Sequence, residues 1–204
     1  MRVDKVILKA FLSTLTAIVC LFAFMFAVLA AAFPSTMMYL AYDFGQDESS
    51  IRYAERAYDW FEDTSYMAHA MEVAIGIDDY AKIEQCGLIV VEDEAYFTQY
   101  CAEKDAVISD TVSMKYAQYV HGKISGAKYA QGKKADAVDY AFSSLQGGFP
   151  QSNAVVSIFY TAYAAGDLET KALIKGKMEE LQASDFDDVE KSYFNSVLVS
   201  VSSN

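Results

Sequence analysis

Residues 10–33, AFLSTLTAIVCLFAFMFAVLAAAF, decide the fold of this chain. The segment holds about 24 residues without a charged side chain, and as a helix it would extend for about 36 Å. The hydrocarbon core of a bilayer is about 30 Å thick, so the segment is long enough to cross it. Apolar residues surround the helix on all sides, unlike the one-sided pattern of a helix on a soluble core. We therefore predict a transmembrane helix over residues 10–33.

The charges on either side of this segment predict its orientation. Three basic residues and one acidic residue precede it, whereas three acidic residues follow it before the next basic residue, Arg52. Basic residues favour the cytoplasmic side, which predicts a single-pass protein of the cell membrane with residues 1–9 in the cytoplasm and residues 34–204 outside it. The alternative is a signal peptide cleaved near Ala30–Ala32, which would release a secreted helical protein. Both interpretations place residues 34–204 on the same side.

Composition narrows the class of partner. The chain has a formal net charge of −12, and because residues 1–33 are net basic, the remainder carries about −14. Nucleic acid and anionic lipid require clustered basic residues, so neither is expected as the main partner. Residues 34–204 are long enough to form one domain with a core, and no Pro-, Ser- or Gly-rich linker divides them.

Helical periodicity recurs after the apolar segment, and sustained strand alternation does not. Glycines at 45, 76, 132 and 166 are predicted to end helices, and Ser49–Ser50 to cap one. Residues 88–91, LIVV, are ambiguous, but their neighbours favour a helix. The predicted fold class is therefore all-α. The expected helices cover residues 35–44, 51–61, 65–75, 80–90, 92–104, 109–131, 136–145, 152–165, 169–181 and 187–199.

Small and aromatic residues surround these glycines in a similar way. The four segments that carry the pattern are AYDFGQDESSIRYAERA (41–57), AIGIDDYA (74–81), KYAQGKKADAVDYAFSSLQGGFP (128–150) and AYAAGDLETKA (162–172). Gly132 and Gly166 are 34 residues apart, the length of a tetratricopeptide repeat. The chain resembles that family, which implies an α-solenoid of antiparallel helix pairs with an extra helix near 93–104. An irregular array of helical hairpins outside the family remains the alternative.

The resemblance also implies a binding surface. In tetratricopeptide-like arrays the first helix of each pair lines the inner face, where partners bind. Placed on that register, the residues expected on the inner face are Tyr119, Tyr129, Asn153, Tyr160 and Tyr163. Tyrosine suits such a surface because its rigid ring also carries a hydroxyl group. The alternative is that these rings only fill gaps between helices.

The sequence offers little that indicates catalysis. His69 and His121 are the only histidines, and we expect them to serve in packing and hydrogen bonding. No motif for a metal, a nucleophile or a phosphate loop occurs, so we predict neither enzyme activity nor a cofactor. Cys86 and Cys101 lie symmetrically about an expected turn at 93–94, which allows either a disulfide or two free buried thiols. Gly122 and Gly126, inside one helix, indicate either a close neighbouring helix or, less readily, a ligand.

These observations predict a membrane-anchored scaffold or adaptor that binds a protein or peptide partner through its extracytoplasmic helical repeats. The alternative is an accessory structural subunit of a larger membrane complex that uses residues 10–33 as its contact.

Overall fold

The computed structural model describes residues 2–107, 115–145, 148–181 and 183–203. Within these ranges the fold is all-α, as predicted, and strands are absent. The helices are α1 (Arg2–Ala32), α2 (Pro34–Asp43), α3 (Asp47–Phe61), α4 (Thr64–Gly76), α5 (Tyr80–Glu92), α6 (Glu94–Val107), α7 (Tyr116–Ala130), α8 (Lys134–Ser143), α9 (Ala154–Ala164), α10 (Leu168–Glu180), the 3₁₀ turn η1 (Ala183–Asp185) and α11 (Asp188–Ser202).

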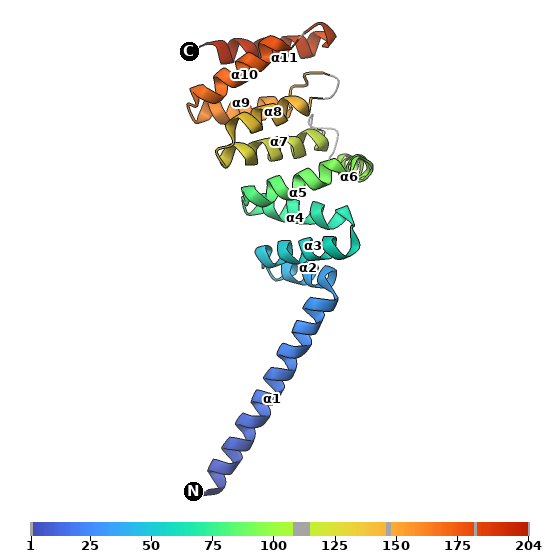
Figure 1. The fold of residues 1–204 in the computed structure, drawn as a ribbon, viewed down its shortest axis with the longest axis vertical. Helices are drawn as coiled ribbons and strands as arrows, with labels where there is room; N and C mark the ends of the chain where they lie inside the picture. The colour runs from blue at the N-terminus through green and yellow to red at the C-terminus, as the bar shows by residue number, and fades with distance from the viewer. Residues whose placement is uncertain (1, 108–114, 146–147, 182, 204) are drawn as a thin grey trace.

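Helix α1 projects from the rest of the molecule (Figure 1). Its segment Lys5–Ala32 has 28 residues with a mean hydropathy of 2.6, and its apolar side chains are exposed along its length. Helix α1 is therefore long and apolar enough to cross a membrane, as the sequence predicted.

The other helices are stacked in chain order along the long axis, from α2 beside α1 to α11 at the far end (Figure 1). Four pairs pack as hairpins: α2 with α3, α4 with α5, α7 with α8 and α9 with α10. Helix α3 packs on α4, α5 on α7 and α8 on α9, so each hairpin contacts the next. Helix α6 is the extra helix that the sequence predicted near residues 93–104.

The turns of the four hairpins share one geometry. Gly45, Gly132 and Gly166 have positive φ values of 67°, 79° and 65°. In each turn the next N–H donates to a carbonyl five residues earlier, with N···O distances of 2.8–3.0 Å. This is the Schellman arrangement that ends a helix and frees the chain to reverse direction.

The turn between α4 and α5 corrects one prediction. Its left-handed residue is Asp78, with φ 55°, whereas Gly76 is the last residue of α4 and lacks a positive φ. Asp79 N–H donates to the Ala74 carbonyl at 3.0 Å, as in the other turns. Asp can adopt this conformation because its short polar side chain bonds locally. Successive left-handed residues are therefore 33, 54 and 34 residues apart.

Two predicted helix starts need comment. Ser49–Ser50 do not cap α3, because the helix begins at Asp47, and Gln46 at the N-cap makes no side-chain cap bond. Ser50 is instead buried inside α3, where its hydroxyl donates to the Met38 carbonyl across the hairpin at 3.0 Å. The predicted start at 109–110 lies outside the described residues, and the described part of that helix begins at Tyr116.

The stack contains two clusters of buried apolar side chains. One joins α2 to α7 and includes Met38, Met71 and Ile124. The other joins α8 to α11 and includes Phe149 and Ile158. Together they form a core that continues along the stack.

Candidate binding groove

A hollow of about 730 Å³ opens between α5, α7, α9 and α11. We call it the α7–α9 groove, because these two helices supply most of its surface. Hollows of about 300–1,000 Å³ commonly hold ligands in proteins. The residues that border it are Asp78, Tyr80, Ile83, Gln118, Tyr119, Gly122, Lys123, Gly126, Ala127, Tyr129, Ala130, Gln151, Ser152, Asn153, Val156, Ser157, Tyr160, Thr161 and Tyr193.

One side of α7 forms the floor of the groove. Gln118, Gly122 and Gly126 are four residues apart, so they lie on one helical face. A Cβ built on Gly122 would lie 3.6 Å from Ser157, an ordinary contact. A Cβ built on Gly126 would have no atom within 4 Å. Close helix packing therefore does not account for Gly126, which leaves α7 open to the groove.

Gln118 supplies an unusual polar group to this floor. Its Oε1 atom is buried and has no hydrogen-bond partner among the described residues. Leaving a buried acceptor unsatisfied costs roughly 1–3 kcal/mol. A ligand with an N–H or O–H donor would recover part of that energy.

Tyrosines form the walls of the groove. On α7, the Lys123 ammonium lies 5.4 Å from the ring centre of Tyr119. Tyr129 donates a hydrogen bond to Asp167 at 2.9 Å, which fixes its ring beside the turn before α10. On α9, Tyr160 is 56% exposed, and it shares a side-chain hydrogen bond with Tyr193 of α11. Most of these rings thus have a fixed position as well as an open face.

Asn153, also predicted for the groove, is only 3% exposed at the start of α9. Its Oδ1 accepts from Val156 N–H at 2.9 Å, and its Nδ2 donates to the Pro150 carbonyl at 2.6 Å. Both polar ends of the side chain are therefore engaged in capping α9, and the residue borders the groove as part of its frame.

The structure brings Tyr119, Tyr129, Asn153 and Tyr160 together around the groove, as the predicted register required. Tyr163 is 61% exposed but does not border the groove as described. Its ring contacts Phe159 and lies 5.5 Å from the Lys171 ammonium. It therefore occupies a neighbouring surface of α9.

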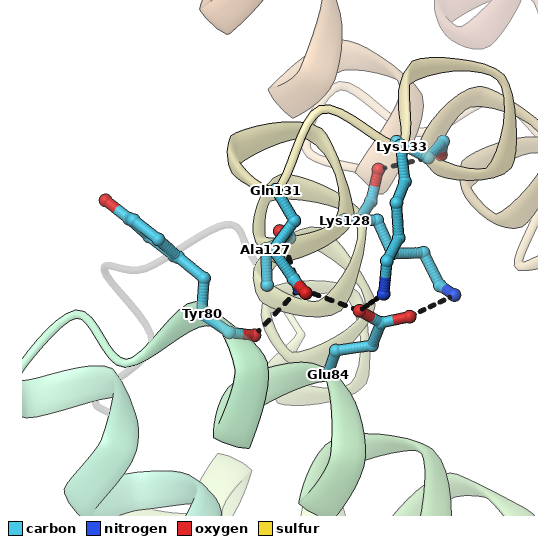
Figure 2. Close-up of polar contacts among 8 residues, drawn as sticks. Tyr80, Glu84, Ala127, Lys128, Gln131 and Lys133 are labelled. Carbon is cyan, nitrogen blue, oxygen red and sulfur yellow. Dashed lines mark hydrogen bonds and ion pairs between the residues drawn. The ribbon is translucent and has the colours of Figure 1, made fainter.

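A cluster of polar side chains at one end of the groove joins α5 to α7 (Figure 2). The Glu84 carboxylate contacts Lys128 at 2.8 Å, Lys133 at 2.6 Å and the Gln131 amide at 2.7 Å. Gln131 also donates to the Tyr80 carbonyl at 3.2 Å. In Figure 2 the Tyr80 ring points away from this cluster.

Electrostatics strengthens that cluster. The Glu84 side chain is only 13% exposed, and burial by itself would raise its pKa. The hydrogen bonds from its three partners outweigh burial and lower the pKa of Glu84 to about 2. Glu84 therefore stays ionised at neutral pH and holds α5 against the turn that follows α7.

The histidines lie in contacts of the kind predicted for them. His69 Nε2 is 3.0 Å from the Ser50 hydroxyl, and the ring meets Tyr39 and Tyr42 edge-on. Because the Ser50 hydrogen is used by Met38, His69 is the donor in that bond. His121 Nδ1 is 2.9 Å from the Tyr140 hydroxyl. Burial lowers the pKa of both histidines.

Cys86 and Cys101 are both buried, and neither is bonded in this structure. Burial raises the pKa of the Cys86 thiol to about 12 and that of the Cys101 thiol to about 11. Both thiols are therefore protonated at neutral pH, which makes them poor nucleophiles.

Sequence reasoning missed Gln118 and Tyr193. Gln118 was accessible, because it precedes Gly122 and Gly126 at the same helical spacing. Tyr193 was not, because its position depends on how the C-terminal helix folds back toward α9. Among the described residues, no group of histidine, cysteine and acidic side chains has the arrangement of a metal site.

Comparisons with protein-family models, with curated proteins and with solved structures give no match to this chain.

Proposed function

We propose that this protein is a membrane-anchored helical-repeat module of tetratricopeptide-like type that binds a protein or peptide partner in the α7–α9 groove. In this proposal α1 crosses the cell membrane, and α2 to α11 form an extracytoplasmic α-solenoid that acts as a scaffold or adaptor. The apolar length of α1 and the basic residues before it support the location. The shared turn geometry, with steps of 33 and 34 residues on either side of the insertion, supports the repeat.

The observation that carries the binding proposal is the composition of the groove. Tyrosines with fixed rings surround a floor that lacks side chains at Gly122 and Gly126, and an unpartnered Gln118 oxygen lies in that floor. A peptide main chain can approach α7 closely at the glycines and donate an N–H to Gln118. Apolar side chains of the partner would contact the tyrosine faces.

The first test fills the groove without disturbing the core. Gly126→Met would place a side chain in the open floor, and it should abolish partner binding while helix propensity rises. Gly176→Met is the matched control, because Gly176 is also helical with no atom within 4 Å of a built Cβ, but lies in α10 outside the groove. A photo-crosslinking residue at Tyr160 in the full chain, expressed in its own cell membrane, reports the partner.

We expect one discrete crosslinked species with the probe at Tyr160, its loss with Gly126→Met and its retention with Gly176→Met. The same probe at Tyr163, outside the groove, should give little of that species. Equal crosslinking in the presence of Gly126→Met would contradict binding in the groove.

The accessory-subunit alternative draws on a different observation. The apolar surface of α1 is exposed over its described side chains, so it is open to contact with another transmembrane helix. Replacing residues 10–33 by an unrelated apolar segment of equal length separates the two proposals. Groove binding predicts that the Tyr160 crosslink persists after the replacement, whereas the accessory role predicts that the association is lost.

A further inference from the structure

Helix α2 carries apolar side chains on a side that faces solvent. Phe33, Leu40 and Phe44 are 54%, 41% and 73% exposed. Their spacing of seven and then four residues places them on one side of the helix. Met38 and Ala41 are buried in the contact with α3. Helix α2 is therefore apolar beyond the part that its own hairpin covers.

Two more exposed aromatic residues lie at the end of α3. Trp60 is 51% exposed and Phe61 is 55% exposed. The Ser50–Met38 hydrogen bond sets residue 50 opposite residue 38 in this hairpin. Trp60 is ten residues beyond Ser50, whereas α2 begins only four residues before Met38. Trp60 therefore lies past the start of α2, at the level where α1 ends.

Helix α2 is the helix of the stack nearest α1, and only Phe33 separates the two (Figure 1). The segment Lys5–Ala32 would extend for about 42 Å at 1.5 Å per residue. A bilayer with its headgroups is about 40–45 Å thick. If α1 spans the membrane, α2 must therefore begin within or directly above the headgroup region.

We propose that the hairpin of α2 and α3 rests on the membrane that α1 crosses, with the apolar side of α2 and Trp60 in the lipid headgroup region. The proposal depends on the membrane-spanning role proposed for α1. Tryptophan and other aromatic side chains favour this region because one part of the ring is apolar and another is polar. The Arg56 guanidinium, 5.5 Å from the Trp60 ring, suits the same environment.

The occupant of this surface is lipid because the surface adjoins the membrane span directly. The domain carries about −14, so anionic headgroups would repel it. The contact should therefore form on zwitterionic lipid and depend little on salt. It would also set the α7–α9 groove, several helices further along the stack, at a distance from the bilayer.

The chain contains one tryptophan, Trp60, which makes the full-length protein its own reporter. We would reconstitute it in phosphatidylcholine vesicles that contain nitroxide lipids labelled either near the headgroup or in the middle of the acyl chain. Trp60 emission should shift to the blue relative to that of an exposed tryptophan. The shallow nitroxide should reduce its intensity more than the deep one.

Three variants in a Trp60→Phe background complete the experiment, with helicity checked by circular dichroism. Phe44→Trp should behave like Trp60, because it reports the far end of α2. Phe26→Trp, inside α1, should be quenched mainly by the deep nitroxide. Val189→Trp, at the 77% exposed start of α11, should not be quenched by either.

Each outcome is decisive. If Phe26→Trp is quenched but either Trp60 or Phe44→Trp is not, the hairpin does not lie on the membrane although α1 spans it. Blue-shifted emission without lipid quenching would assign the surface to a protein contact instead. Quenching of Val189→Trp would mean that the whole stack lies on the bilayer. If Phe26→Trp itself is unquenched, both the proposed span and this inference fail.

Discussion

Gly87 and Gly126 lack side chains for opposite physical reasons. A Cβ on Gly87 would lie 2.7 Å from Cγ1 of Ile124 and 2.9 Å from its Cδ1, whereas a Cβ on Gly126 would meet nothing. Ile124 is fully buried, so it has little room to move. Gly87 thus permits α5 to pack closely on α7, and Gly126 keeps the groove open.

This contrast predicts opposite effects of the same substitution. Gly87→Ala should lower the free energy of unfolding by about 1–2 kcal/mol, because overpacking outweighs the gain in helix propensity. Gly126→Ala should raise it by about 0.5–1 kcal/mol, since only the propensity changes. Denaturant unfolding of the full chain in mild detergent measures both. A neutral Gly87→Ala would show that Ile124 can move aside and that the close packing is dispensable.

At the scale of elements, the left-handed turns define the hairpins. Gly132 has φ 79° and no atom within 4 Å of a built Cβ, so its cost of substitution is conformational alone. Gly132→Ala should therefore destabilise the protein by about 1 kcal/mol. Gly176→Ala, in a right-handed helix with equally open space, should instead stabilise it by about 0.5–1 kcal/mol. Equal effects of the two substitutions on denaturant unfolding would contradict the turn geometry.

The errors of prediction also arise at this scale. Helix positions followed from periodicity and glycine, and three of the four turns were placed correctly because glycine is the usual left-handed residue. Asp78 was missed because Asp takes that conformation less often. Ser50 was taken for a cap because its partner, the Met38 carbonyl, belongs to another helix.

For the groove, the turn register sufficed to bring Tyr119, Tyr129, Asn153 and Tyr160 together. It could not assign Asn153 to capping, which depends on the bend at Pro150. It could not reveal the unpartnered Gln118 oxygen either, because burial is a property of the packed helices. Contacts set by local turns were thus predictable, and those set by distant packing were not.

The whole molecule is asymmetric, with basic residues before α1 and a strongly acidic stack after it. This asymmetry underlies the proposed orientation, and the native cysteines make it testable by thiol labelling. Cys86 and Cys101 are buried, with pKa values raised to about 12 and about 11, so they should not react with a maleimide at neutral pH. Cys20 lies within α1, inside the proposed span. The unmodified protein should therefore give a low background with a membrane-impermeant reagent.

Single cysteines at the two ends then report the topology. Ser202→Cys, exposed at the end of α11, should be labelled on intact cells by an impermeant maleimide. Val6→Cys, 67% exposed at the start of α1, should be labelled only after the membrane is permeabilised. The reverse pattern would place the stack in the cytoplasm and would make the proposed partner a cytoplasmic one. Labelling of both residues on intact cells, with Ser202→Cys recovered in the medium, would instead indicate release after cleavage.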